Sequence, residues 1–325
     1  MSELKTAVIG AGYFGSHHAR KYAGLPSANL VAVCDVDQAN ADRLAGELGC
    51  EAVTDHHDLI GRVDAVSVAT PTAAHFSVAS DFMRAGVHVL VEKPLCSSLD
   101  QADRLIELAR EKGVVLQVGH LERFNPAVAA LEGQVKRPGF IECQRISPFR
   151  GRGTDVNVIL DMMIHDIDLV LSLVKAPIEW TDAVGVPVLS NEDDIASARI
   201  RFANGCVASF TASRVSWKTH RSMRIFQADA YIVADLNDAK VSTIRKTMNA
   251  DGQPELSQEE ETFESGDPLN LEVASFVETV TSGGMPKVSG HDGREALAAA
   301  LKISRQVADW TDRQREANRA AEGPR

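Results

Sequence analysis

The chain lacks several features that mark secreted, membrane-spanning or metal-ribbon proteins. Its five cysteines are odd in number and none forms a C-x-x-C pair, which argues against a disulfide framework and a zinc ribbon. No apolar stretch approaches the roughly 20 residues of a transmembrane helix, and the opening MSELKTAVIG contains no cationic and apolar leader. We therefore expect a cytoplasmic protein with reduced thiols and no membrane partner.

Positive charge is also scarce. Lysine and arginine (34) are outnumbered by aspartate and glutamate (45), and the net charge is -11. This balance disfavours nucleic acid and anionic membranes as partners, so an anionic ligand must be held by a local basic cluster or by backbone amides. The 325 residues, 44% of them hydrophobic, are enough to bury a sizeable core in one large domain or two ordinary ones.

Strand and helix patterns alternate in the first part of the chain. One helix is expected to stop at Gly49, and another to open with a capping box of Ser98 and Gln101 and to end at Gly113. Continuous apolar strands that alternate with helices predict a doubly wound parallel sheet, so we expect an α/β Rossmann domain over residues 1–120. Five apolar runs are expected to be its strands, at residues 6–9, 30–34, 65–69, 87–91 and 114–118.

The pattern changes after Pro148. A helix is expected at about residues 157–174, and two strands are expected on either side of the hairpin signal Asn204-Gly205. Further alternating segments continue an antiparallel meander at residues 222–236 and 239–246. These patterns predict an α+β domain with a large antiparallel sheet.

The remaining segments set the expected domain limits. The polar segment 248–267 is expected to be a loop, and helices are expected at about 270–282 and 294–310, with a frayed tail after Arg313. We therefore expect the second domain at residues 121–289. The C-terminal helix, about 290–312, is a candidate to pack back on the first domain.

A glycine pattern directly follows the first expected strand. AVIGAGYFG contains Gly10-x-Gly12-x-x-Gly15, with Tyr13 and Phe14 between the last two glycines. Glycines in this context allow a tight turn and a close approach of the backbone to a pyrophosphate at a helix N-terminus. The alternative is a glycine turn that binds no cofactor.

An acidic residue ends the second expected strand. Asp35 lies 20 residues after Gly15, where a carboxylate accepts the ribose hydroxyls of NAD and repels a 2′-phosphate. Asp37 is an alternative for this role, although it also fits the first turn of the next helix. We expect NAD as the cofactor.

Polar residues follow two further strands at the ends where open α/β sheets bind ligands. VATPTAAH places Thr70, Pro71 and His75 there, and His75 fits helix-start polarity equally well. VEKPL places Glu92 and Lys93 before a proline that fixes the backbone. We expect Lys93 to reach a substrate hydroxyl and the nicotinamide ribose; the alternative is a surface salt bridge.

The segment ILDMMIHDIDLV combines an apolar helix with an unusual number of charges. Asp161 and His165 are spaced i and i+4, which places them on one helix face, with Asp168 close to that face and Asp166 pointing elsewhere. A histidine titrates near neutral pH and suits proton removal from an alcohol. A metal site is the alternative, but no second histidine or cysteine supports it nearby, so we expect no metal.

Two further motifs carry candidate substrate contacts. GHLERFNP contains Arg123 and Asn125 as expected site-lining residues, while His120 fits either a cofactor pocket or a buried hydrogen-bonded position. For Arg123 a salt bridge between the domains is the alternative.

The motif RISPFRGRGTD supplies a local arginine cluster, Arg145, Arg150 and Arg152, in an otherwise acidic protein. Guanidinium groups suit a diphosphate through paired hydrogen bonds, so Arg150 and Arg152 are expected to bind a nucleotide sugar. A solvated basic loop is the alternative, and Arg214 is a weaker candidate.

Taken in order, GAGYFG, ATPTAAH, EKPL, GHLERFNP and DMMIHDID resemble the motifs of the Gfo/Idh/MocA oxidoreductases over about residues 5–306. Within that family the segments around GHLERFNP and DMMIHDID are most similar to bacterial enzymes that oxidise C3 of UDP-N-acetylglucosamine. The resemblance implies NAD or NADP as hydride acceptor, and Lys93, Asp161 and His165 at the reacting carbon. It implies His165 as general base and Lys93 as the group that orients the oxygen, although the two roles can be exchanged.

The resemblance also implies a place in metabolism and an assembly. The 3-keto sugar is expected to feed a PLP aminotransferase in 2,3-diamino sugar (lipid A) synthesis. Alternatives are a dehydrogenase of another nucleotide sugar, a free sugar or a cyclitol, and, in a different class, a non-catalytic NAD-binding regulator. The sheet face not covered by helix 157–174 is expected to form a homo-oligomer, a dimer or tetramer.

Overall fold

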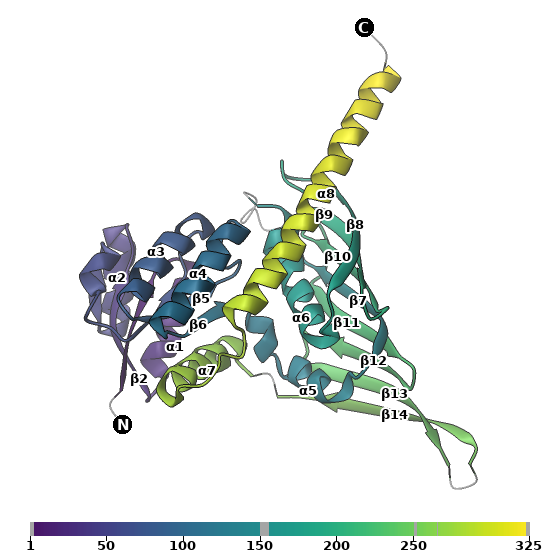
Figure 1. Cartoon of the computed structure of the whole chain (residues 1–325), viewed down its shortest axis with the longest axis horizontal. Coiled ribbons are helices and arrows are strands. Elements are labelled where there is room, and N and C mark those ends of the chain that lie inside the picture. Colours follow the sequence, from purple (N-terminus) through teal and green to yellow (C-terminus); the bar gives the residue numbers. More distant parts are fainter. Residues whose placement is uncertain (1–2, 150–155, 250–251, 265, 323–325) are drawn as a thin grey trace. The chain divides into compact units, whose positions relative to one another are not determined.

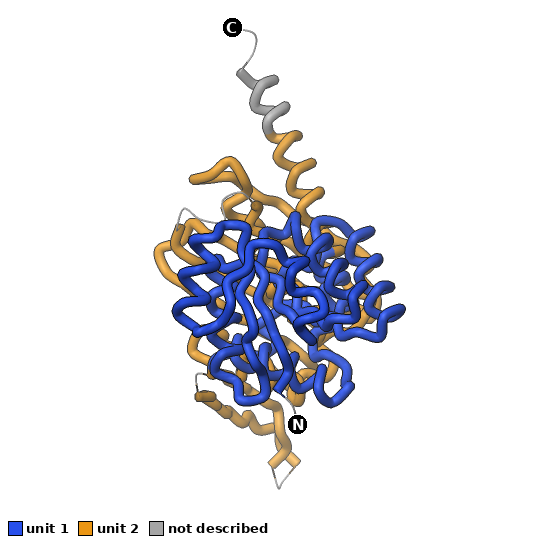
Figure 2. The backbone as a smooth tube through the Cα atoms, turned by 90° about the vertical axis from the view of Figure 1, so that its left-hand side faces the viewer, with its two compact units in different colours: residues 1–124, 267–297 blue, residues 125–266, 298–325 orange. Residues whose placement is uncertain are grey.

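The computed structural model describes residues 3–149, 156–249, 252–264 and 266–322, and its elements are shown in Figure 1. The chain divides into two compact units, coloured separately in Figure 2. Unit 1 consists of residues 1–124 and 267–297, and unit 2 of residues 125–266 and 298–325. Each unit is therefore built from two separate stretches of the chain.

Unit 1 contains a six-stranded sheet in the order β3-β2-β1-β4-β5-β6, in which every strand pair is parallel. This is the strand order of a dinucleotide-binding Rossmann fold, so the predicted α/β class is confirmed. All five expected strands are present; the short β3 was not predicted because it has only three residues and a half-exposed pattern. The strands are β1 (Leu4–Ile9), β2 (Ala28–Cys34), β3 (Glu51–Val53), β4 (Ala65–Val68), β5 (His88–Glu92) and β6 (Leu116–Gly119).

The helices of unit 1 begin and end where their capping residues predict. Gly49 and Gly113 adopt the left-handed conformation with φ of 71° and 64°, and they end α2 and α4 as expected. Ser98 accepts a hydrogen bond from the backbone N–H of Gln101 at 3.4 Å, which confirms the predicted start of α4. The helical elements are α1 (Tyr13–Gly24), α2 (Gln38–Leu48), η1 (His56–Leu59), α3 (Thr72–Arg84), α4 (Leu99–Lys112), η2 (Leu121–Phe124) and α7 (Pro268–Ser282).

Two late segments of the chain belong to unit 1. Val273, Phe276 and Val277 of α7 join the buried cluster that contains Tyr22 and Leu90. The beginning of α8 (Gly290–Glu322) lies against β6, where a Cβ on Gly293 would be 2.7 Å from a Val118 methyl group. Segment 267–289 was expected in the second domain, and its apolar helix face instead completes the core of unit 1.

Unit 2 contains an eight-stranded sheet in the order β14-β13-β12-β11-β7-β10-β9-β8. Only the β7–β10 pair is parallel, so the predicted antiparallel sheet is confirmed. The expected hairpin joins β9 and β10, with Gly205 at a φ of 86°. The strands are β7 (Pro138–Ile146), β8 (Ile178–Val186), β9 (Ile195–Phe202), β10 (Val207–Ser213), β11 (His220–Gln227), β12 (Ala230–Asp235), β13 (Lys240–Met248) and β14 (Pro254–Thr262).

The prediction of a loop at residues 248–267 is wrong, because this segment contains β14. β14 is an edge strand paired with β13, and nearly all its side chains are exposed. Neither face packs on a core, so no apolar alternation marks it. Opposite charges across the pair support it instead, as in the 2.7 Å ion pair between Lys240 and Glu260.

Helices cover one face of the unit 2 sheet. They are α5 (Pro126–Gln134), the π-helical turn η3 (Ile159–Met163) and α6 (Ile164–Val174). The later part of α8 lies along β8, where Gln306 donates to the Thr181 carbonyl at 2.8 Å. The expectation that this helix ends near Trp310 is wrong, since α8 continues to Glu322.

Among the described residues, no helix is long and apolar enough to cross a lipid bilayer.

Candidate active site

The candidate residues fall into two groups, one in each unit. The glycine turn, Asp35, the loops after β4 and β5 and Arg123 belong to unit 1. Asn125, Asp161 and His165 belong to unit 2.

The glycine turn between β1 and α1 is built from close backbone contacts. Gly10 has a φ of 100°, and a Cβ on it would lie 2.5 Å from the Ala69 carbonyl oxygen. A Cβ on Gly15 would lie 1.7 Å from the Gly10 carbonyl oxygen. In contrast, a Cβ on Gly12 would meet nothing within 4 Å, so the space outside the N-terminus of α1 is open. This arrangement fits a pyrophosphate at the helix start.

Two exposed aromatic residues follow the turn. Tyr13 and Phe14, the first residues of α1, are 60% and 44% exposed, and their rings meet edge to face at 5.4 Å. Large apolar rings exposed beside a ligand site are available to cover a bound molecule.

Asp35 follows β2 and is tied directly to the glycine turn. Its Oδ2 accepts a hydrogen bond from the Ala11 backbone N–H at 2.7 Å, and its Oδ1 accepts from Asp37 N–H at 2.9 Å. A carboxylate has about four acceptor positions, so two remain for ribose hydroxyls. Asp37 caps α2 by accepting from Ala39 N–H, which is the helix-start position weighed from the sequence. Asp35 is therefore the acidic residue that fits NAD.

His75 connects the loops after β4 and β5. Its ring is buried, with Nε2 2.8 Å from the Thr70 carbonyl and Nδ1 3.0 Å from the Pro94 carbonyl. Burial lowers the pKa of His75, although the two carbonyls oppose this effect. Thr70 Oγ1 is buried without a partner in the described structure, and Pro71 is exposed at the start of α3. His75 thus connects the two loops through their backbone carbonyls.

Glu92 at the end of β5 is buried in a hydrogen-bonded chain. Its Oε1 lies 2.8 Å from His18 Nε2, and its Oε2 accepts from the Lys93 backbone N–H at 3.2 Å. Farther along the chain, His18 Nδ1 lies 3.2 Å from Ser67 Oγ, which is 2.9 Å from the Tyr22 hydroxyl. Burial raises the pKa of Glu92, but the contacts with His18 and the charge of Lys93 outweigh it, so the pKa is lowered. Lys93 itself is half-buried.

Reasoning from the sequence did not single out His18, Ser67, Tyr22 or Glu272. Glu272 is a charged residue on the apolar face of α7, and this misplaced charge was the signal available. His18 shows no such signal, since a histidine in an amphipathic helix is ordinary. The partners come from four different elements, so only the folded chain brings them together.

In unit 2 the predicted helix with Asp161 and His165 begins as a π-helix. Ile164 N–H reaches the carbonyl of Ile159, five residues earlier, which widens the turn that carries Asp161. His165 lies in the first turn of α6, and both side chains are half-buried. The i, i+4 spacing of Asp161 and His165 therefore spans a widened π-helical turn and not the regular α-helical turn expected from the sequence. Such π-turns are frequent at functional sites.

Arg145 is part of a buried ion pair with Asp166. Arg145 donates to Asp166 through Nε and a terminal nitrogen, the shortest distance being 2.7 Å, and both side chains are almost fully buried. The pair joins β7 to α6. Asp166 is therefore structural as expected, and Arg145 serves this pair rather than a surface arginine cluster.

Arg214 is a second buried arginine with a carboxylate partner. It donates to Asp194 at 2.7 Å and to the Val156 carbonyl at 2.9 Å. Burial raises the pKa of Asp194, but backbone N–H groups, Arg214 and Ser190 lower it well below its usual range. Arg150 and Arg152 lie outside the described residues.

The remaining substrate candidates have structural contacts. Arg123 is buried, with a terminal nitrogen 3.8 Å from a carboxylate oxygen of Asp292 in α8. Asn125 caps α5 by accepting from Ala127 N–H at 3.0 Å, and it donates to the Leu236 carbonyl at 3.0 Å. Asp168 and His120 are buried.

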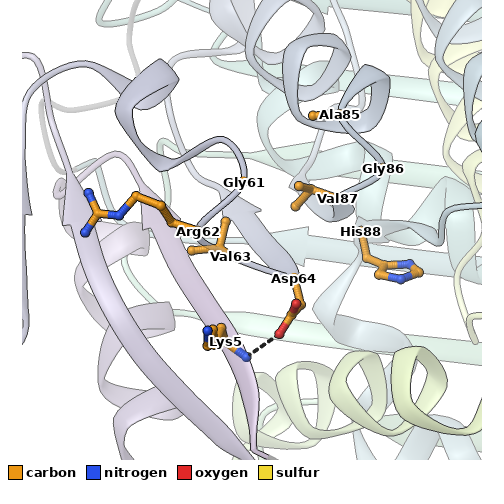
Figure 3. A pocket seen from close by; sticks show the side chains of 9 residues that line it. All are labelled: Lys5, Gly61, Arg62, Val63, Asp64, Ala85, Gly86, Val87 and His88. Atoms are coloured by element: carbon orange, nitrogen blue, oxygen red, sulfur yellow. Dashed lines mark hydrogen bonds between the residues drawn. The ribbon is translucent and has the colours of Figure 1, made fainter.

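A cavity of about 310 Å³ lies at the amino ends of β1, β4 and β5 in unit 1. Figure 3 shows the residues that line it. Its walls come from the segments that lead into β1, β4 and β5, and Lys5 N–H donates to Asp64 within it. Ligands of open α/β sheets bind at the carboxyl ends of the strands, whereas this cavity is at the amino ends. We therefore do not assign it to the cofactor. It is lined by Lys5, Gly61, Arg62, Val63, Asp64, Ala85, Gly86, Val87 and His88.

Comparison with protein families gives two matches that follow one another along the chain. Residues 4–120 match the model described as oxidoreductase family, NAD-binding Rossmann fold. Residues 128–233 match the GFO/IDH/MocA C-terminal domain.

Individual relatives agree with these matches. The chain is 38% identical to UDP-N-acetylglucosamine 3-dehydrogenase of Acidithiobacillus ferrooxidans, over 93% of this chain and 97% of that protein. A solved structure of the Acidithiobacillus enzyme superposes with a TM-score of 0.88 at 37% identity, covering 94% of this chain and 98% of that one. The chain is also 28% identical to scyllo-inositol 2-dehydrogenase (NAD(+)) of Bacillus subtilis, over 99% of each.

The position of Asp35 predicts how the cofactor is selected. Asp35→Ala removes charge-assisted hydrogen bonds to the ribose, so the Kd for NAD should rise about 10- to 100-fold. Discrimination against NADP should fall at the same time, because no carboxylate remains to repel its 2′-phosphate. Titrating cofactor fluorescence with both reduced dinucleotides measures the two effects.

Asp37→Ala provides the matched control. This change removes the cap of α2 and should lower the free energy of unfolding by about 1 kcal/mol without altering the NAD-to-NADP preference. If Asp37→Ala changes the NAD-to-NADP preference and Asp35→Ala does not, Asp37 is the residue that contacts the ribose.

Proposed function

The chain belongs to the Gfo/Idh/MocA oxidoreductase family, and from this premise we propose that it oxidises the C3 hydroxyl of UDP-N-acetylglucosamine to the 3-keto sugar with NAD. The observation that carries the proposal is the 38% identity to a UDP-N-acetylglucosamine 3-dehydrogenase over nearly the whole of both chains. A C3 ketone is the group that a PLP aminotransferase converts to an amine. We therefore place the reaction before such a transamination, in 2,3-diamino sugar (lipid A) synthesis.

The residues of this chain fit the chemistry of alcohol oxidation. When bound, NAD accepts a hydride from the carbon that carries the hydroxyl. The hydroxyl proton must leave at the same time, and His165 is the residue proposed to take it. Lys93 is proposed to orient the oxygen and to stabilise its developing charge, and Asp161 to fix the orientation of His165.

Substrate choice is proposed from the sequence and from the relatives. Arg150 and Arg152 are proposed to bind the diphosphate of the UDP-sugar, because two neighbouring guanidinium groups suit its oxygens. Arg123 and Asn125 remain proposed site-lining residues. The match to an inositol dehydrogenase keeps a cyclitol as the second candidate substrate.

Turnover with a panel of substrates tests the proposed reaction. With NAD, the protein should form NADH with UDP-N-acetylglucosamine and much less with myo-inositol, scyllo-inositol or free N-acetylglucosamine. A PLP aminotransferase added to the assay should increase the yield, because it removes the keto product. NADH absorbance follows the reaction and mass spectrometry identifies the product.

Two other results would point elsewhere. Faster oxidation of a cyclitol, together with no change in KM for UDP-sugar in an Arg150→Ala, Arg152→Ala variant, would replace the nucleotide-sugar assignment. Tight NAD binding with no oxidation of any hydroxylated substrate would instead indicate a non-catalytic regulator.

His165→Asn tests the proposed base. Loss of a general base should lower kcat by about 10²- to 10⁴-fold, while the Kd for NADH changes little because the cofactor residues are unaltered. Stopped-flow turnover and NADH fluorescence separate the two effects. If His165→Asn retains kcat while Lys93→Met loses it, Lys93 is the residue that accepts the hydroxyl proton.

We also propose that the protein is a homo-oligomer, a dimer or tetramer, which associates through the uncovered face of the unit 2 sheet. That face has half-buried or exposed apolar side chains where neighbouring strands meet. Phe226 stacks on Tyr231 at 4.8 Å and lies 5.7 Å from Phe140, while Val184 and Val186 are 39% and 42% exposed. Exposed apolar side chains on a broad sheet face favour burial against a second copy.

Light scattering after gel filtration tests the assembly. The unmodified protein should elute as an oligomer, and Val184→Glu with Val186→Glu should shift it toward the monomer. Met285→Glu is the control, because Met285 is 85% exposed in unit 1. A monomeric unmodified protein at micromolar concentration would refute the proposed assembly.

The proposed place of action is the cytoplasm. All five cysteines are free, and Cys34, Cys96, Cys143 and Cys206 are buried. A protein with buried free thiols and no disulfide suits a reducing compartment.

A further inference from the structure

Unit 1 contains a buried set of titratable side chains that the proposed reaction does not use. His18 of α1 and Glu272 of α7 have no exposed surface, and Glu92 of β5 is 6% exposed. One ligand-type atom from each lies within 4.8 Å of the others. Burying a carboxylate is unfavourable unless its charge is balanced, so the protonation of this set has to be defined.

Counting hydrogen atoms along the chain assigns the charge. The Tyr22 hydroxyl can donate to Ser67 Oγ, Ser67 can donate to His18 Nδ1, and His18 Nε2–H can donate to Glu92. Each hydrogen then has one acceptor, with a neutral imidazole and an ionised Glu92. A protonated His18 would donate to Ser67 from Nδ1 as well. Ser67 would then donate to the Tyr22 oxygen, and the hydrogen of the Tyr22 hydroxyl would have no acceptor in the contacts of the described residues.

Glu272 is the opposite case. Neither of its carboxyl oxygens has a hydrogen-bond partner in the part of the chain that the structure describes. Burial, followed by the charge of Glu92, raises its pKa well above the usual range. Two carboxylates this close cannot both ionise without large repulsion, and Glu92 has the donors.

The surrounding backbone is shaped around Glu92. A Cβ on Gly119 of β6 would lie 3.0 Å from Glu92 Cα and 3.1 Å from its Oε1. A side chain at this position would crowd Glu92 and force its backbone or carboxyl group to shift. The same carboxyl group accepts the Lys93 backbone N–H, so it is tied directly to the proposed catalytic lysine.

From these contacts we propose that His18, Glu92 and Glu272 form a positioning network in which Glu92 holds a single fixed negative charge next to Lys93 and Glu272 is its neutral partner. This inference rests on the proposed dehydrogenase function for the role of Lys93. The charge of Lys93 helps to lower the pKa of Glu92, and the hydrogen bonds fix the backbone from which Lys93 extends. Glu92 acts through Lys93 and is not itself a catalytic residue.

The groups that face Glu92 come from every element around it. His18 and Tyr22 belong to α1, Lys93 follows β5, and Glu272 belongs to α7. His75 of α3 also interacts electrostatically with Glu92. Ser67 of β4 and Gly119 of β6, which also lie next to this network, do not titrate. Burial raises the pKa of Tyr22, which keeps its hydroxyl as a donor.

Thermal unfolding as a function of pH tests the charge assignment without any substrate. A raised pKa in the folded state means that the stabilisation from Glu272 is complete below its unfolded pKa and is lost as pH rises. Glutamine does not ionise, so Glu272→Gln should not lose stability in this way. The Tm of the variant minus the Tm of the unmodified protein should therefore increase from about pH 5 to about pH 8. Glu278→Gln, the same change at an exposed position of α7, should show a constant difference. A constant or falling difference for Glu272→Gln would overturn the assignment.

Kinetics test the positioning role. Glu92→Gln should lower kcat about 10- to 100-fold and move the pH–rate profile to lower pH. This loss of kcat should be at least about tenfold larger than the loss caused by Glu272→Gln. KM should change less than kcat, and Glu92→Asp, which restores the charge, should recover most of the loss. An equal loss in Glu92→Asp and Glu92→Gln, or an unshifted profile, would reduce the network to a structural role. If Glu92→Gln does not fold, the Glu92→Asp profile and the Glu272→Gln unfolding series still decide the question.

Metal analysis and substrate turnover complete the test. One equivalent of zinc or manganese in the purified protein, absent from Glu272→Gln, would overturn the proposal, because an ion would require an ionised Glu272. If the unmodified protein oxidises no UDP-sugar or cyclitol, the proposed function fails, while the pH dependence of Tm still confirms or refutes the charge assignment.

Discussion

The buried carboxylate of Glu92 ties together elements of unit 1 that are far apart in the chain. It lies at the end of β5, where the chain leaves the sheet to place Lys93, and its two oxygens have different donors. His18 faces inward from α1 to reach it, and a side chain in place of Gly119 in β6 would crowd it. The glycine turn, the loop with Lys93 and helix α7 are thereby held around one fixed charge.

Unit 2 uses the same principle twice. Arg145 with Asp166 joins a central strand to α6, and Arg214 with Asp194 joins the end of β10 to the segments at Val156 and Ser190. Removing one partner of such a buried pair leaves an uncompensated charge, which costs about 3–5 kcal/mol. The first pair holds α6, which carries His165, and the second holds the backbone at Val156, shortly before η3 with Asp161. Arginines near a candidate site are therefore not all ligand contacts.

Cofactor binding and substrate choice depend on different parts of the chain. The NAD-binding Rossmann domain serves a dinucleotide, which related enzymes with different substrates share. The same family layout occurs in proteins named for inositol and for UDP-N-acetylglucosamine, so the fold does not determine the substrate. Substrate choice has to come from side chains, and Arg150 and Arg152 are the residues proposed for it.

Local sequence signals were enough to predict the Rossmann sheet, the glycine turn with Asp35, the hairpin at Gly205 and the helix with Asp161 and His165. These signals are apolar runs, capping residues and fixed spacings within about 25 residues. It took the folded chain to reveal that β14 is an edge strand, that Arg145 pairs with Asp166, and that His18 and Glu272 meet Glu92. The physical reason is that these features depend on contacts between residues far apart in the chain. His18 and Glu272 are ordinary helix residues until folding buries them beside the same carboxylate.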